Sequence, residues 1–103
     1  MGENDNIPQM TPSFENICRK DENGNEYWSS RDLCGAMGYS AYWKFQRVID
    51  KAIKVAGEKG MNVDEHFNQA VDMVKIGNGS FRKVNIFRLS RMACMIIAEN
   101  ADG

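Results

Sequence analysis

Two Asn-Gly pairs divide this chain of 103 residues, and each pair lies between two segments of strand-like composition. Asn-Gly favours the left-handed backbone of a tight turn, so a pair with such flanks predicts a β-hairpin. The first pair, Asn23-Gly24, would join strands within 14–20 and 26–29. The second, Asn78-Gly79, would join strands within 71–76 and 81–87. Because an isolated hairpin is marginally stable in water, we expect both hairpins to share one antiparallel sheet.

Helical periodicity appears between the hairpins and after the second one. The predicted helices span about 30–37, 41–57 and 90–99, with Ser29 or Ser30, Ser40 and Ser90 as N-caps and with Gly38, Gly57 and Gly60 as stops. The last helix is apolar on all sides, so we expect it to be buried. Residues 61–70 are compatible with a turn or with a short helix capped by Asp64. The sequence thus predicts an α+β fold, a small antiparallel sheet packed with three helices in the order ββααββα.

The length suits one domain, which we expect to span 13–103 after a flexible, polar N-terminal arm at 1–12. The longest apolar run has seven residues, 92–98, against about 20 in a membrane-spanning helix, so we expect no membrane contact. The three cysteines are irregularly spaced and suit neither a disulfide framework nor a metal site. Cys34 and Cys94 are predicted core residues of a protein in a reducing cytoplasm.

No catalytic constellation can be assembled from the sequence, so we expect a protein that is not an enzyme and that needs no cofactor or metal. The single histidine, His66, has no evident metal-ligating partners. We expect its side chain to form a hydrogen bond near the start of a helix.

A formal net charge of -1, from 13 basic and 14 acidic residues, hides an uneven distribution. Residues 73–98 hold five basic side chains and no acidic one: Lys75, Arg82, Lys83, Arg88 and Arg91. In the long helix, Lys44, Arg47, Lys51 and Lys54 lie opposite the apolar stripe, with Trp43 beside them. A basic face with an exposed indole can bind phosphates and stack a base, or it can be a solvated face with a cation–π pair. These ten residues are the candidate nucleic-acid contacts.

The second hairpin and the last helix sharpen this expectation. With Asn78-Gly79 as a two-residue loop, Lys75 would lie directly opposite Arg82, and the two cations would repel. Either a bound anion or a carboxylate from 61–72 would offset that repulsion. Arg88 and Arg91 flank the start of the last helix, where they would suit a phosphate or pair with an acid such as Asp32.

The order and spacing of several motifs resemble the DNA-damage-inducible protein D family. The resemblance covers about 14–102 and is carried by segments 14–17, 21–29, 31–33, 38–39, 48–52, 66–67 and 73–80, by Trp43, Phe45 and Arg82, and by positions 89–91, 93–94, 96–97 and 100. It implies a bacterial, cytoplasmic protein of the SOS-type DNA-damage response. It also implies that the chain is the N-terminal domain of a longer protein, similar to the BRO N-terminal domain of viral and phage proteins. Such a domain would bind DNA, single- or double-stranded, or modulate recombinase filaments on DNA.

Two other interpretations stay open. The chain could be a protein-interaction domain or a domain that forms a homodimer, with an exposed Trp28, Trp43 or Phe81 as the anchor. It could also be a helix-turn-helix reader, formed by the helix that ends near residue 37 and the helix that starts at 41.

Overall fold

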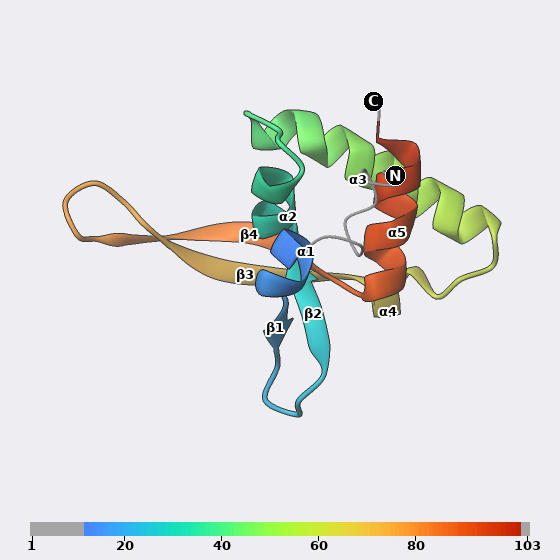
Figure 1. Cartoon of the computed structure of the whole chain (residues 1–103), viewed down its shortest axis with the longest axis horizontal. Coiled ribbons are helices and arrows are strands. Elements are labelled where there is room, and N and C mark those ends of the chain that lie inside the picture. The colour runs from blue at the N-terminus through green and yellow to red at the C-terminus, as the bar shows by residue number, and fades with distance from the viewer. Residues whose placement is uncertain (1–11, 102–103) are drawn as a thin grey trace.

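The computed structural model describes residues 12–101 and shows an α+β fold with one four-stranded sheet (Figure 1). The predicted flexible arm at 1–12 lies outside the described residues, except for Pro12. The elements are α1 (Pro12–Asn16), β1 (Arg19–Lys20), β2 (Glu26–Ser29), α2 (Ser30–Ala36), α3 (Tyr42–Glu58), α4 (Val63–His66), β3 (Phe67–Lys75), β4 (Phe81–Leu89) and α5 (Arg91–Asn100). The predicted class is confirmed, and the predicted order ββααββα is extended by two short helices, α1 and α4.

Both hairpins form, and they join into one antiparallel sheet of order β1-β2-β4-β3. Strand β2 pairs with β4 only at the inner end of β4, where Trp28 lies opposite Leu89 and Ser29 lies opposite Arg88. The rest of β3 and β4 therefore continues as a two-stranded ribbon that projects from the helices (Figure 1). We call its outer part, residues 71–85, the arm.

The loop of the arm has three residues, where the sequence predicted two. The backbone N–H of Ile76 donates to the carbonyl of Ser80 at 2.8 Å, and the N–H of Gly79 donates to the carbonyl of Ile76 at 3.0 Å. Gly79 has φ 90°, the left-handed conformation that closes a three-residue hairpin loop. The same design recurs at Gly24, with φ 83°.

The extra loop residue shifts the register of the arm by one position. Lys75 lies opposite Phe81, and Val74 lies opposite Arg82. The predicted opposition of Lys75 and Arg82 is therefore wrong. Because side chains alternate along a strand, Lys75 and Arg82 point to opposite faces of the ribbon.

Two of the predicted helix caps are confirmed. The Ser29 side chain accepts a hydrogen bond from the N–H of Arg31 at the start of α2, and Ser90 accepts one from Ala93 at the start of α5. The predicted Ser40 cap is wrong, because Ala41 precedes α3 and offers no side-chain oxygen. Helix α3 also continues through Gly57, and Gly60 follows its end with φ 80°.

The segment 61–70 resolves into a four-residue helix and the start of β3. The Asn62 side chain caps α4 by accepting from the N–H of Glu65, so the predicted cap at Asp64 is wrong. His66 ends α4, and its Nδ1 lies 2.6 Å from the hydroxyl of Ser90, the cap of α5. The expected hydrogen bond of His66 near a helix start is confirmed.

The segment predicted as the first strand begins instead as helix α1. The ring of Phe14 stacks on that of Trp28, with centroids 4.4 Å apart, and the indole N–H of Trp28 donates to the Phe14 carbonyl at 2.9 Å. Trp28 is fully buried, so its predicted exposure is wrong. A contact across 14 positions of sequence thus decides the conformation of this segment.

The core lies where α3, α5 and the inner sheet meet. The apolar stripe of α3 buries Phe45, Ile49, Ala52 and Ala56, and α5 buries Ala93, Cys94, Ile96 and Ile97. Cys34 is buried as well, so both predicted core cysteines are confirmed. Helix α5 is buried on one side only, since Met92 is 48% exposed, so the expectation of a helix buried all round is wrong. Within residues 12–101, no helix has the length and apolarity that crossing a membrane requires.

Candidate nucleic-acid interface

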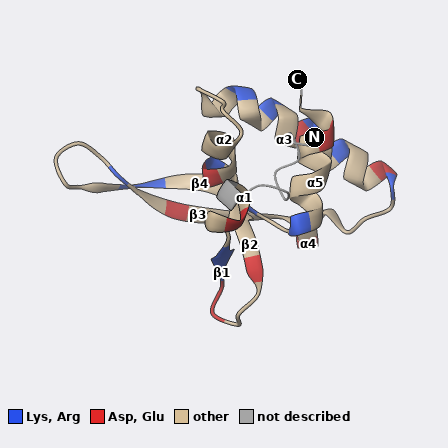
Figure 2. Ribbon diagram, in the orientation of Figure 1, with Lys and Arg blue, Asp and Glu red and all other residues tan. Residues whose placement is uncertain are grey.

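The predicted basic residues fall into three groups in the structure (Figure 2). Helix α3 carries Lys44, Arg47, Lys51 and Lys54 beside Trp43. The arm carries Lys75, Arg82 and Lys83. The inner end of the sheet carries Arg88 and Arg91.

On α3, all four cations are exposed, and none forms an ion pair with another described residue. Trp43 is 61% exposed, as the interface prediction requires. Its ring lies 5.7 Å from the Lys44 ammonium and 5.9 Å from the Arg47 guanidinium. The expected pair of Trp43 and Arg47 therefore forms, and it leaves most of the indole open to solvent.

On the arm, Lys75, Arg82 and Lys83 are exposed and likewise have no ion-pair partner in 12–101. The predicted carboxylate from 61–72 does not reach them. The Asp72 carboxylate binds Arg19 of β1 at 3.4 Å, and Arg19 also binds Asp32 at 2.9 Å. From 73 to 85 the arm thus holds three cations and no anion.

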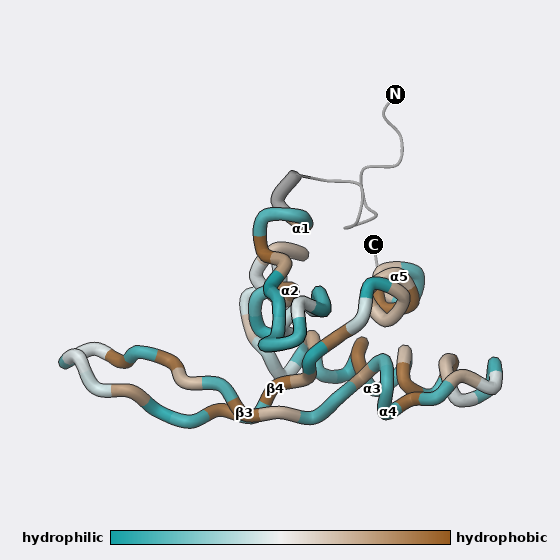
Figure 3. Tube along the Cα trace, turned by 90° about the horizontal axis from the view of Figure 1, so that it is seen from below, coloured by the Kyte–Doolittle hydropathy of each residue, from teal (hydrophilic) through white to brown (hydrophobic). Residues whose placement is uncertain are grey.

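One face of the arm combines cations with exposed apolar side chains. Val71 (56% exposed), Met73 (52%) and Phe81 (61%) share this face with Lys75 and Lys83. Residues two positions apart in a strand point to the same face, and so do residues directly opposite each other in neighbouring strands. Figure 3 shows that hydrophobic and hydrophilic positions are interspersed along the whole ribbon. We call this set of five side chains the apolar-basic face. Arg82 points to the opposite face.

At the inner end of the sheet, the two arginines differ. The Arg88 guanidinium lies 4.7 Å from the ring centre of Tyr27, and it has no ion pair within the described chain. Arg88 is exposed, so its cation can still reach a phosphate.

Arg91, by contrast, already holds two carboxylates. Its guanidinium binds Glu15 of α1 and Glu26 of β2, each at 3.0 Å, and it lies 4.9 Å from the ring centre of Trp28. The hydrogen bonds that Arg91 donates to these carboxylates raise the pKa of Arg91 and lower the pKa of Glu26. The acid partner suggested by the sequence, Asp32, instead binds Arg19. Arg91 therefore joins α1 to the sheet.

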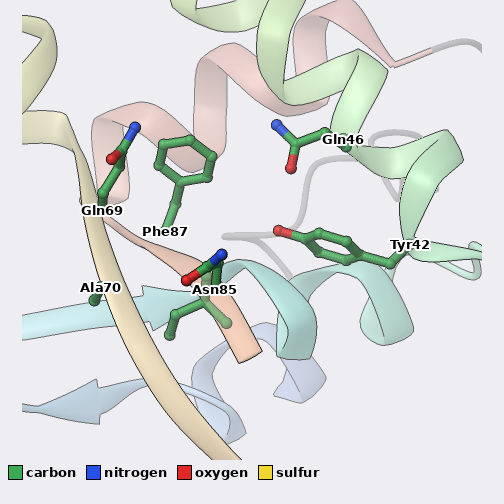
Figure 4. A pocket seen from close by; sticks show the side chains of 7 residues that line it. Tyr42, Gln46, Gln69, Ala70, Asn85 and Phe87 are labelled. Carbon is green, nitrogen blue, oxygen red and sulfur yellow. The ribbon is translucent and has the colours of Figure 1, made fainter. Parts of the chain in front are cut away.

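The structure also brings together five residues that sequence reasoning missed. Tyr42 and Gln46 of α3 line an open pocket of about 310 Å³ with Gln69 of β3 and with Asn85 and Phe87 of β4 (Figure 4). The only sequence signal is that Asn85 and Phe87 are two positions apart in a predicted strand and so share a face. The described residues contain no group of three side chains suited to hold a metal ion.

The comparisons with known proteins agree with the motifs. The chain is 39% identical over 89 residues to DNA damage-inducible protein D of Escherichia coli, a match that covers 86% of this chain and 32% of that protein. The chain thus spans about a third of the length of this relative. No family model and no solved structure matches, so similarity to the BRO N-terminal domain stays a prediction. The match confirms the resemblance to the DNA damage-inducible protein D family that the motifs indicated.

Proposed function

We propose that this chain is a DNA-binding module of a DNA-damage-response protein and acts by binding, without catalysis. The observation that carries the proposal is the set of seven exposed cations on α3 and the arm that have no ion pair among the described residues. Seven such cations would repel one another, and contact with DNA phosphates would relieve this repulsion. The same contacts would release the counterions that are condensed on the DNA, which favours binding.

The shape of the two basic surfaces supports the same function. A two-stranded ribbon can enter a groove of DNA or lie along its backbone. Exposed apolar side chains on such a ribbon can contact bases, and Trp43 can stack on one. The name of the Escherichia coli relative supports a role in the response to DNA damage. Modulation of recombinase filaments, which the resemblance implies, would follow if the chain occupies the same strand.

The test is fluorescence anisotropy of labelled single- and double-stranded oligonucleotides over a series of salt concentrations. We expect the affinity to fall with salt, with a slope of about 0.7 to 0.9 per phosphate bound. Lys75→Glu with Lys83→Glu, and separately Arg47→Glu with Lys51→Glu, should each weaken binding by about tenfold and lower the slope.

Lys20→Glu is the control, since Lys20 is an exposed cation on β1, the edge strand opposite β3 in the sheet. It should change the affinity by about twofold or less, as a single charge outside the interface does. No binding at low salt would overturn the proposal. So would double variants that bind as well as the control variant.

A second candidate function has one observation in its favour, the exposed apolar side chains of the arm. Val71, Met73 and Phe81 lie on one face of a ribbon whose outer edge is unpaired in the described chain. Such an edge can pair with another chain. Under this alternative, Phe81→Ser would convert a dimer to a monomer in light scattering. A parent chain that is monomeric at high concentration would exclude the dimer.

A further inference from the structure

We propose that the pocket between α3 and the arm binds an unstacked nucleobase of the DNA strand, an inference that rests on the proposed function. The pocket lies between the first turns of α3 and the inner part of β3 and β4, so it joins the two parts of the fold that carry the basic surfaces. Gln69, Asn85 and Phe87 share the strand face that continues outward as the apolar-basic face. On α3, Tyr42 and Gln46 lie one position before Trp43 and Arg47, a step of about a quarter turn around the helix.

The lining has the chemistry of base recognition. The side-chain amides of Gln69 and Asn85 form no hydrogen bond with another described residue, so each amide offers two donors and an acceptor. The Gln46 amide nitrogen donates to Asp50 at 3.0 Å, which leaves the Gln46 carbonyl free to accept. The edge of a base presents donors and acceptors side by side, and amides match it well. Figure 4 shows the Phe87 ring next to these amides, where it offers an apolar surface.

The pocket is also held in shape from behind. The Ser30 hydroxyl is fully buried, lies 2.7 Å from the Tyr42 hydroxyl and accepts from the Phe87 N–H at 2.9 Å. The Ser30 hydroxyl therefore links Tyr42 of α3 to Phe87 of β4 and fixes the two sides of the pocket relative to each other. Burial raises the pKa of Tyr42, which keeps its hydroxyl protonated and able to donate.

The distribution of charge selects a nucleotide strand over other ligands. No charged side chain lines the pocket, and the Asp50 carboxylate bound to Gln46 disfavours an anion there. The cations belong to the same two elements, α3 and the β3–β4 ribbon, outside the pocket lining. A strand has the same pattern, since its bases are neutral and its phosphates are anionic. A volume of about 310 Å³ lies at the lower end of ligand pockets, which suits one flat ring system.

The test compares a labelled single-stranded 12-mer of deoxyadenosine with a 12-mer in which the central nucleotides are abasic, so that the phosphates are the same. We expect the chain to bind the intact strand at least about tenfold more tightly, as base stacking and amide pairing would give. The variant that carries both Gln69→Leu and Asn85→Leu should lose this preference and keep the salt slope.

Asn68→Leu is the matched control, because Asn68 is an exposed amide on the opposite face of β3. It should keep both the preference and the slope. The side-chain amide signals of Gln69 and Asn85 in the parent chain provide a readout that needs no variant, and they should shift with the intact strand only.

The outcomes separate this inference from the proposed function. Equal binding of intact and abasic strands, with a normal salt slope, would overturn the base pocket and leave DNA binding in place. A preference that survives the double variant would overturn the assignment to this pocket. Binding of neither single strand would overturn the base pocket, and the proposed function would fall as well if double-stranded DNA also failed to bind.

Discussion

Arg91 provides the sharpest test of how this fold is held together. We consider Arg91→Met, which keeps an unbranched apolar stem over Trp28 and removes the charge. The change breaks the ion pairs to Glu15 and Glu26 and the contact of the guanidinium with the Trp28 ring. Since these side chains are 40–49% exposed, solvent screens both pairs, and each contributes about 0.5 kcal/mol.

The net magnitude follows from three contributions. The two pairs give about 1 kcal/mol together, and the cation–π contact adds about 0.5 kcal/mol or slightly more. Against them, Arg91 is the first residue of α5, where a cation opposes the helix dipole by about 0.3 to 0.5 kcal/mol. We therefore expect the free energy of unfolding to fall by about 1 kcal/mol and Tm by about 4–8 °C.

The assay is chemical and thermal unfolding followed by circular dichroism, with Arg88→Met as control. Arg88 also lies over a ring, that of Tyr27, but it has no ion pair within the described chain. Its loss should be about 0.5 kcal/mol or less. A double-mutant cycle of Arg91→Met with Glu26→Gln should show a coupling of about 0.5 kcal/mol.

Two results would refute this reasoning. One is an Arg91→Met variant no less stable than Arg88→Met. The other is an Arg91→Met variant that, while still folded, binds DNA about tenfold more weakly than the parent chain, because this would place Arg91 at the interface.

Three further predictions concern stability, acid and thiol chemistry. Ser30→Ala should lower the free energy of unfolding by about 1–3 kcal/mol in urea titrations, because the N–H of Phe87 loses its acceptor, the buried Ser30 hydroxyl. A loss below about 0.5 kcal/mol would contradict this. Because the pKa of Glu26 is lowered in the folded chain, its ionised form stabilises the fold above the ordinary pKa of 4.5. This stability is lost as the pH falls through the lowered pKa. Tm of the Glu26→Gln variant should therefore depend less on pH in the acid range than Tm of the parent chain. Under native conditions a thiol reagent should modify Cys18 first and Cys94 last, because burial raises the pKa of Cys94 strongly and leaves it inaccessible; equal rates would argue against the described core.

The register of the arm shows where local reading fails. Asn78-Gly79 correctly located the turn, because only a few residues tolerate a left-handed backbone. The same dipeptide serves loops of two and of three residues, and the difference moves every side chain of one strand to the other face. The sequence therefore predicted the cations of the arm but not that Lys75 and Lys83 share a face while Arg82 does not.

By itself, the sequence determined the elements whose signals are local: the two turns, the Ser29 and Ser90 caps, the apolar stripe of α3 and the uneven charge along the chain. These depend on backbone preference and periodicity over a few positions. Tertiary structure alone decided the features that join distant segments. Trp28 stacks on Phe14, in a segment that forms a helix where a strand was predicted. Arg91 pairs with Glu15 and Glu26, although the sequence suggested a phosphate site there. Side-chain amides 16 to 39 positions apart line one pocket. Such contacts depend on the whole chain being folded, because no short window of sequence contains both partners.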